Sequence, residues 1–139
     1  MNYKFFDHTA DVLFEAEGKN LGELFEACGL ATEETQVDLK GVKTRIKKEI
    51  SLEKDNIEML LFDFLQELIY LKDAELLLFS KIKVSVSEGK INKVKAVLEG
   101  EKINPKKHEL KVDVKAVTLH RFEVKKIKTG WFARIILDI

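Results

Sequence analysis

The chain is poor in the residues that mark several protein classes. Its 139 residues include one cysteine, one proline and seven glycines. A single cysteine excludes an internal disulfide framework and a cysteine-only zinc site. The low proline and glycine content excludes collagen-like and low-complexity chains. Lysine plus arginine and aspartate plus glutamate each number 24, which gives a net charge of zero. We therefore do not expect a general electrostatic binder of nucleic acid.

Long hydrophobic runs are also missing. The strongest apolar stretches, residues 59–62 and 76–79, are far shorter than the roughly 20 residues of a membrane-spanning helix. The start, MNYKFFDHTAD, lacks the basic region and apolar core of a signal peptide. We expect a cytoplasmic protein without a membrane partner. Hydrophobic residues make up 45% and charged residues 35%, as in a folded globule, and the length predicts a single domain over residues 1–139.

The charges are unevenly distributed along the chain. Residues 1–40 hold three lysines and nine acids, for a net charge of −6. Residues 81–115 hold ten lysines and five acids, for a net charge of +5. Two interpretations remain open. The solvated faces of helices and strands differ in sign, or the first segment forms an acidic ion site and the second a basic docking edge.

Two segments have the pattern of amphipathic helices. The first is predicted to begin at Asn20, with Glu23 at the position of a capping box. Its apolar face is formed by Leu21, Leu24, Phe25, Cys28 and Ala31. The second is predicted to follow a cap at Asp55. Its wider apolar stripe is formed by Ile57, Leu60, Leu61, Phe64, Leu65, Leu68 and Ile69. We expect both helices to cover a sheet, and Cys28 to be a core residue rather than a catalytic thiol.

Most of the remaining chain alternates between apolar and polar residues, as half-buried strands do. A short apolar start ends at Phe6, and the alternating pattern lies near residues 12–17, 43–52, 81–87, 93–98, 112–116, 122–124 and 131–137. Turns are predicted at residues 87–90, at Asn104-Pro105 and at residues 128–130. The order is strand, strand, helix, strand, helix and then a run of strands. It predicts an α+β fold, in which a mostly antiparallel β-sheet system is covered by two α-helices.

The first segment with chemical potential is Asp7-His8-Thr9-Ala10-Asp11. One interpretation is a turn, with Asp7 closing an Asx-turn and Thr9 capping backbone N–H groups. The other is a metal site, because Asp7 and Asp11 would face the same side of an extended segment. Carboxylate and carbonyl oxygens suit Ca²⁺ or Mg²⁺ better than Zn²⁺.

The second such segment is the end of the chain, Ile136-Leu137-Asp138-Ile139. Asp138 and the terminal carboxylate place two anions on adjacent residues. If the last strand is held in a sheet, this pair is rigid, and a cation would offset the repulsion. The alternative is that Asp138 is a solvated surface acid.

Other catalytic and metal-binding signatures are absent. The sequence contains no phosphate-binding loop, dinucleotide fingerprint, HExxH zinc motif, nucleophile elbow or EF-hand loop. The histidines, His8, His108 and His120, are too far apart in sequence to suggest a zinc site. A Ser–His–Asp triad has no positive support from the spacing.

Four blocks of the sequence form a specific combination: Asp7-His8-Thr9-Ala10-Asp11-Val12, Lys115-Ala116-Val117-Thr118-Leu119-His120, Gly130-Trp131-Phe132-Ala133-Arg134 and the final Asp138-Ile139. In these blocks the chain resembles the archease family. The leucine-rich segment Leu60–Tyr70 is also similar to the family's second helix. These blocks cover essentially the whole chain. Two positions depart from the family pattern, which has glycine in place of Leu13 and tyrosine in place of Leu119.

The resemblance implies a protein cofactor with an archease-like fold rather than an enzyme. Archeases assist the RtcB-type tRNA-splicing ligase, which joins RNA ends with GTP and a divalent metal, and they promote its guanylylation and repeated turnover. The tRNA and GTP would thus be met only through the ligase. The family has a metal site of calcium type, and magnesium and manganese are alternatives.

The resemblance also assigns roles to residues of this chain. The implied metal ligands are Asp11, Asp138 and Ile139, the last through main-chain or terminal carboxylate oxygens. Asp7 and His8 would be their neighbours. Lys115 and His120 are the implied contacts to phosphate or to the partner.

Three other interpretations stay open. A direct RNA-binding module would use the basic segment 81–115, although no aromatic residues are interleaved with its lysines. A small metal-dependent nucleotide enzyme would use the acid cluster. A chaperone-like role would rest only on the likeness of the family fold to a redox chaperone domain.

Overall fold

A computed structural model of the chain describes residues 2–6 and 11–139. It contains, in chain order, β1 (Asn2–Phe6), β2 (Asp11–Gly18), α1 (Leu21–Gln36), a 3₁₀ helix (Leu39–Gly41), β3 (Ile46–Lys54), α2 (Ile57–Glu75), β4 (Leu77–Ser87), β5 (Asn92–Lys102), β6 (Ala116–Ile127) and β7 (Gly130–Asp138). The predicted order of strands and helices and the α+β class are confirmed.

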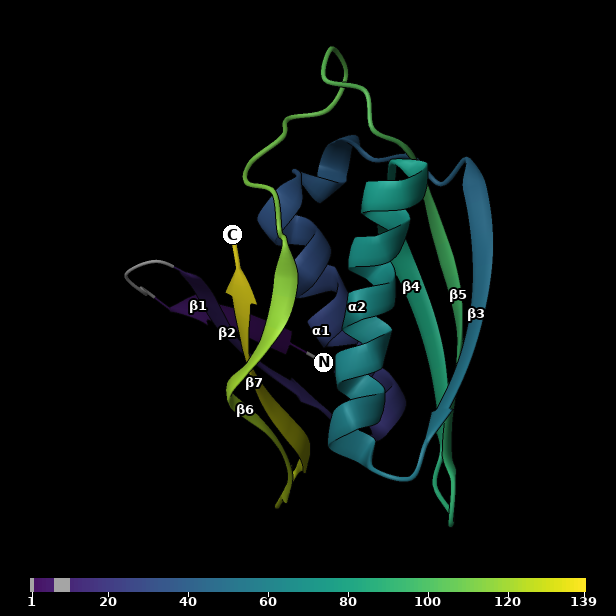
Figure 1. The fold of residues 1–139 in the computed structure, drawn as a ribbon, viewed down its shortest axis with the longest axis vertical. Coiled ribbons are helices and arrows are strands. Elements are labelled where there is room, and N and C mark those ends of the chain that lie inside the picture. Colours follow the sequence, from purple (N-terminus) through teal and green to yellow (C-terminus); the bar gives the residue numbers. More distant parts are fainter. Residues whose placement is uncertain (1, 7–10) are drawn as a thin grey trace.

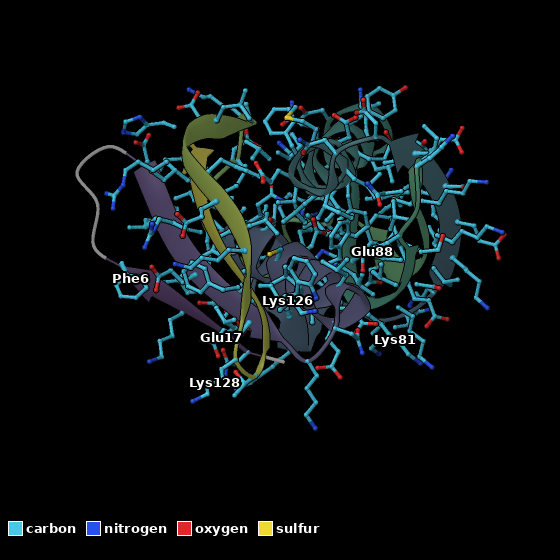
Figure 2. All side chains as sticks on the ribbon, turned by 90° about the horizontal axis from the view of Figure 1, so that it is seen from below. Phe6, Glu17, Lys81, Glu88, Lys126 and Lys128 are labelled. Atoms are coloured by element: carbon cyan, nitrogen blue, oxygen red, sulfur yellow. The ribbon has the colours of Figure 1, made fainter. Side chains whose placement is uncertain are left out.

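The strands form two separate sheets, with the helices between them. The strand orders are β1-β2-β7-β6 and β3-β5-β4, and every pairing among the described strands is antiparallel. Figure 1, and the view from below in Figure 2, place α1 and α2 between the two sheets. Each helix contacts strands of both sheets. The helices therefore bury more of their surface than a helix that lies on one sheet, and they form the centre of the core.

Helix α1 begins as predicted. The Asn20 Oδ1 atom accepts a hydrogen bond of 2.9 Å from the Glu23 N–H, and the Glu23 carboxylate accepts one of 3.1 Å from the Lys19 N–H. The predicted apolar face is buried, and Cys28 has no exposed surface. Burial raises the pKa of the Cys28 thiol well above its usual range. Cys28 is thus an inert core residue, as predicted.

Helix α2 is capped one residue later than predicted. The Asn56 Oδ1 atom accepts a hydrogen bond of 3.0 Å from the Met59 N–H, and Asp55 lies in the preceding loop. Aspartate and asparagine are equally good caps, so the choice between neighbours depends on the loop geometry. Here the Asp55 carbonyl accepts a hydrogen bond from Asn92 Nδ2 at 3.2 Å, which holds the loop against the start of β5.

The cap assignment predicts different costs for the two neighbours. We expect Asn56→Ala to lower the free energy of unfolding by about 1 kcal/mol, because the Met59 N–H loses its partner at the helix end. Asp55→Ala should change it by less than about 0.5 kcal/mol. Urea unfolding of both variants measures the difference. Equal losses, or a larger loss for Asp55→Ala, would contradict the assignment.

The predicted strand near residues 112–116 begins only at Ala116. Residues 103–115 form a connection that is tied to the end of α1: the Lys111 N–H donates to the Gln36 carbonyl at 2.9 Å. Val114 is fully buried, and its N–H donates to Gln36 Oε1 at 3.3 Å. The alternation in this segment therefore reflects burial of Val114 against the helices rather than pairing in a sheet.

Two local features shape the β6-β7 hairpin. Gly130 at its turn has φ +144°, and a Cβ there would clash with the Gly18 carbonyl oxygen, so only glycine fits. Strand β6 also carries a bulge between Thr118 and Glu123, where Arg121 has φ +54°.

No helix formed by residues 2–6 and 11–139 is long and apolar enough to cross a membrane.

Candidate metal and partner site

Two of the predicted metal ligands lie opposite each other at one end of the β1-β2-β7-β6 sheet. Strands β2 and β7 are antiparallel, and Asp11 is the direct partner of Asp138. Such partners point to the same face of a sheet, with Cβ atoms about 4.5–5.5 Å apart. Asp138 is exposed, Asp11 is half-buried, and Ile139 follows Asp138 directly. Like charges in this position destabilise a sheet, so the pairing would be relieved by a cation.

The structure places the other predicted site residues differently. The Lys115 N–H donates to the Asp138 carbonyl at 2.8 Å, and Lys115 is exposed. His120 is also exposed, but it lies in the bulge of β6, further along the strand than the residue that pairs with Asp138. Asp7 and His8 lie outside the described residues. Asp11, Asp138 and Lys115 are therefore brought together, and His120 is set apart from them.

The donor chemistry of the acidic pair fits a hard divalent cation. Asp11 and Asp138 offer carboxylate oxygens, and Ile139 offers a main-chain oxygen, the donors that Ca²⁺, Mg²⁺ and Mn²⁺ prefer. Within residues 2–6 and 11–139, no three His, Cys, Asp or Glu side chains are grouped to hold a metal. An ion held by this pair would therefore need main-chain oxygens, water, or Asp7 and His8 to complete its shell.

One buried oxygen lies on the same face of the sheet as the pair. The Thr118 hydroxyl is buried and has no hydrogen-bond partner among the described residues. Thr118 lies opposite Ile136, one row below the row that holds Ala116, Asp138 and Asp11. An unpartnered buried hydroxyl is costly, and here it lies on the face of the sheet that carries the acidic pair.

The two departures from the family pattern have different surroundings. Leu13 lies opposite Phe6 and Ile136 and is only 9% exposed. It therefore fills the outer face of the sheet next to the acidic pair. Leu119 lies in the β6 bulge and is 58% exposed. Its side chain thus contributes little to the core.

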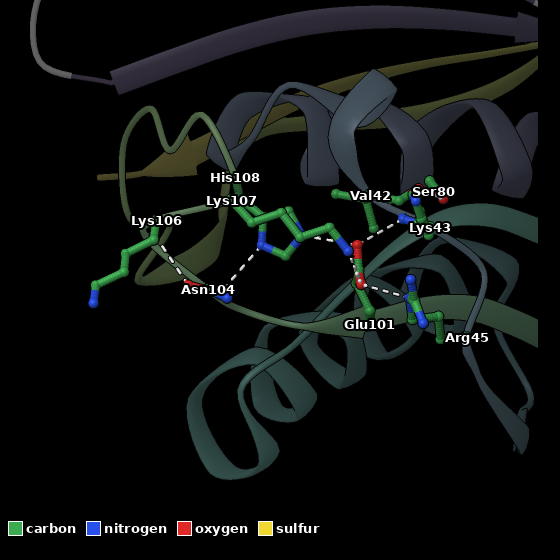
Figure 3. Close-up of polar contacts among 9 residues, drawn as sticks. All are labelled: Val42, Lys43, Arg45, Ser80, Glu101, Asn104, Lys106, Lys107 and His108. Atoms are coloured by element: carbon green, nitrogen blue, oxygen red, sulfur yellow. Dashed lines mark hydrogen bonds and ion pairs between the residues drawn. The ribbon is translucent and has the colours of Figure 1, made fainter.

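Sequence analysis missed a buried ion network that holds the connection 103–115 (Figure 3). The side chains of Glu101 and His108 are 7% and 0% exposed, and His108 Nε2 lies 2.9 Å from Glu101 Oε2. Lys107 Nζ donates to the other Glu101 oxygen at 2.7 Å, and Arg45 Nε lies 3.5 Å from it. The Lys43 N–H donates to Glu101 Oε2 at 2.8 Å. The network fastens the start of the connection to the sheet β3-β5-β4.

The hydrogen bonds of this network assign a role to each ring nitrogen of His108 and lower the pKa of Glu101. His108 Nδ1 accepts from the Asn104 N–H at 2.9 Å, so Nε2 is the ring nitrogen that donates to Glu101. The hydrogen bonds from His108, Lys107 and the Lys43 N–H lower the pKa of Glu101 to about 2. The sequence contained one indication of this network, because Glu101 and His108 lie seven residues apart on either side of the Asn104-Pro105 turn.

A second buried polar group was also missed, at the other end of the connection. Lys72 continues the apolar stripe of α2, four residues after Leu68, yet its side chain is only 7% exposed. Its Nζ atom donates to the Val114 carbonyl at 2.8 Å and to the Asp113 carboxylate at 2.5 Å. Lys115, whose N–H donates to the Asp138 carbonyl, follows Val114 directly. Lys72 thus holds the segment that reaches the acidic pair.

The basic segment 81–115 does not form one cationic surface. On the face of the sheet β3-β5-β4 that points away from the helices, Glu99 lies opposite both Lys47 and Lys81. Lys81 Nζ and the Glu99 carboxylate are 3.5 Å apart. The signs alternate along this row, and Lys93 lies opposite Glu53 on the same face, further along the strands. Acids and lysines are therefore mixed on this face, which matches the interpretation of solvated faces more closely than that of a basic docking edge.

The fold and the site together define a small three-layer α+β protein with paired carboxylates at a sheet end. The model of the archease protein family matches residues 3–139. The protein archease of Archaeoglobus fulgidus is 38% identical over 139 residues, covering 100% of both chains. That of Pyrococcus furiosus is 38% identical over 141 residues, covering 99% of this chain and 98% of the relative. The chain therefore belongs to the archease family.

Solved structures agree with this assignment. The solution structure of protein 1598 from Methanobacterium thermoautotrophicum matches with a TM-score of 0.87 and 36% identity, over 99% of this chain and 98% of that one. The crystal structure of an archease from Thermotoga maritima, described as a possible chaperone, matches with a TM-score of 0.66. At 23% identity over 98% and 96% of the two chains, this second likeness supports the fold.

Proposed function

We propose that this protein activates the RtcB-type tRNA-splicing ligase, promoting its guanylylation and multiple turnover without being an enzyme itself. Membership of the archease family over residues 3–139 supports the proposal. The observation that carries it to a site is the pairing of Asp11 with Asp138, with Lys115 bonded to the Asp138 main chain. In this view the chain meets tRNA and GTP only through the cytoplasmic ligase.

The acidic pair is proposed to hold a divalent cation at the tip of the sheet. Asp11, Asp138 and a main-chain oxygen of Ile139 would be its ligands, with Asp7 and His8 as neighbours. Calcium suits an open, flexible set of oxygen donors, and magnesium and manganese are alternatives. A cation bound there would supply positive charge that neutralises phosphate oxygens during guanylyl transfer.

The side chains around the pair are proposed to contact the ligase. Lys115 is exposed next to Asp138, and its compact ammonium group suits a phosphate or an acidic patch. His120 is exposed in the β6 bulge and would contact the partner at a separate point. The main-chain bond of Lys115 to Asp138 keeps the cationic and anionic parts of the surface in register.

The test is formation of the covalent ligase–GMP adduct with labelled GTP and Mn²⁺ or Mg²⁺. We expect the wild-type protein to accelerate adduct formation, and Asp11→Ala and Asp138→Ala each to reduce the acceleration at least tenfold, because the paired carboxylates are lost. Calcium titration of the same variants should show weaker binding. Asp55→Ala, an exposed aspartate before α2, is the matched control and should behave like the wild type.

Two outcomes would contradict this proposal. Full acceleration by a folded Asp138→Ala variant would remove the acidic pair from the mechanism. Hydrolysis or transfer of a nucleotide by the purified protein in the absence of ligase, lost in Asp138→Ala, would instead favour a small metal-dependent enzyme.

A further inference from the structure

The two sheets have four edge strands, and three of them are visibly protected. On β4, the carboxylates of Glu33 and Glu26 in α1 accept hydrogen bonds from the Phe79 N–H at 2.7 Å and the Val84 N–H at 3.0 Å. On β6, the Gln66 side chain of α2 accepts from the Val117 N–H at 2.8 Å, and a bulge follows. Helix side chains and bulges of this kind block pairing with another chain.

The third protected edge, β3, relies on charge. Lys48 and Lys54 on this strand form ion pairs with Glu75 and Asp63 of α2, at 2.7 Å and 3.4 Å. Lysines along an edge strand oppose the approach of a second strand, because a neighbouring chain would have to bury or displace them. The edge therefore carries long charged side chains near both of its ends.

Strand β1 has none of these devices. It pairs on one side with β2, and no other described residue hydrogen bonds to its main chain. Its only charged residue is Lys4, and Phe5 and Phe6 are 43% and 44% exposed. Figure 2 shows Phe6 at the outer margin of the molecule, on the opposite side from Lys81. An apolar, uncovered edge is the kind of surface that receives an added strand.

The free edge adjoins a largely apolar cleft that reaches Asp11, one member of the acidic pair. The cleft has a volume of about 430 Å³, and its walls include Phe5, Phe6, Val12, Val112 and Asp11. Glu34 and Lys111 complete the charged part of its lining, so acids outnumber bases around it. A side chain that enters this cleft would be apolar, and its flanking residues would be neutral or basic.

We propose that β1 is the docking edge for an extended segment of the ligase, which adds as a strand to the sheet β1-β2-β7-β6 and seats an apolar side chain in the cleft beside Asp11. This rests on the proposed function, and it explains how the acidic pair is held at the partner's active site. Continuity of the cleft with Asp11 favours the ligase over a second copy of this chain. A centred antiparallel pair of β1 strands would also place Lys4 opposite its own copy, which is unfavourable.

The proposal is tested by binding of the full-length protein to the ligase with two variants. We expect Phe6→Lys and Val112→Lys each to weaken the affinity at least tenfold, because a charge enters the edge or the cleft. Ile91→Lys, in the β4-β5 turn and 48% exposed, is the matched control and should bind like the wild type. Main-chain amides of residues 2–6 should exchange at least tenfold more slowly in the complex.

Three other results of this experiment would overturn the docking edge, its occupant or the proposed function. Wild-type affinity in Phe6→Lys and Val112→Lys, with ligase activation intact, overturns the docking edge and leaves the proposed function standing. Self-association of the wild type that Phe6→Lys abolishes would assign the edge to a second copy. Absence of any ligase binding by the wild type overturns the proposed function, and the partner named here with it.

Discussion

The wild-type protein should become less stable as the pH rises from about 5 to about 8. We expect Glu33→Gln to abolish most of this loss in the free energy of unfolding. Glu33 is fully buried in α1. One of its carboxyl oxygens accepts the Phe79 N–H at 2.7 Å, and the other has no hydrogen-bond partner within residues 2–6 and 11–139. Burial raises the pKa of Glu33 to about 8, even though the Phe79 hydrogen bond and the charge of Lys72 lower it in part.

The sign of the effect follows from proton linkage. The folded protein keeps the Glu33 proton up to a pH of about 8, whereas the unfolded chain releases it near the ordinary value of about 4.3. Between these values the folded state binds more protons, so the free energy of unfolding falls as the pH rises. A full proton of difference costs about 1.4 kcal/mol per pH unit. Glutamine keeps the acceptor for the Phe79 N–H and carries no proton to lose.

Urea unfolding of both proteins at several values between pH 5 and pH 8 measures this effect. The free energy of unfolding of Glu33→Gln should exceed that of the wild type by an amount that grows with pH and reaches a few kcal/mol near pH 8. Glu34→Gln, the next residue in the same helix and only half-buried, is the control and should keep the wild-type slope. A constant difference between Glu33→Gln and wild type would show that Glu33 does not titrate in this window.

The second large effect is expected at Lys72. In Lys72→Met the aliphatic stem is retained, but the buried Val114 carbonyl loses a donor at 2.8 Å and Asp113 loses its ion pair. Burial lowers the pKa of Lys72, but the hydrogen bonds to Asp113 and Asp73 outweigh it and raise the pKa overall. We expect a loss of about 2 kcal/mol, mostly from the unpartnered carbonyl.

Hydrogen exchange distinguishes this local effect from general destabilisation. In Lys72→Met the amides of residues 111–115 should exchange faster than those of the core strands, and ligase activation should fall because Lys115 is no longer held beside Asp138. Lys54→Met, which removes a half-exposed ion pair of 3.4 Å to Asp63, is the control and should cost less than about 1 kcal/mol. Equal exchange at residues 111–115 in both variants would overturn the role of Lys72.

The sequence predicted the parts of the fold that depend on local patterns. The Asn20 cap, the apolar face of α1 and the order of the elements follow from periodicities of 3.6 and 2 and from cap chemistry, which act over a few residues. The neighbour choice between Asp55 and Asn56 failed because both residues cap equally well. The position of the helices between two sheets could not be predicted from the pattern. An apolar stripe identifies the buried face of a helix, but it does not determine whether one sheet or two pack against that helix.

The candidate site was likewise predictable only in part. The resemblance selected Asp11, Asp138 and Lys115, but their contact depends on β2 pairing with β7 across most of the chain, which no local pattern contains. Glu33, Lys72 and Glu101 were missed because charged residues are usually exposed, and their burial depends on partners distant in sequence. The roles of Asp11, Asp138 and Ile139 as metal ligands stay predictions that the cation titration tests.

The most direct test of the central claim is a multiple-turnover RNA ligation assay. It contains a cognate RtcB-type ligase, GTP, Mn²⁺ or Mg²⁺, and this protein in substoichiometric amounts. We predict that the wild type sustains repeated turnover of the ligase and that Asp138→Ala, folded to the same extent, does not. Absence of stimulation by well-folded wild type, with a ligase that completes a single turnover, would contradict the account.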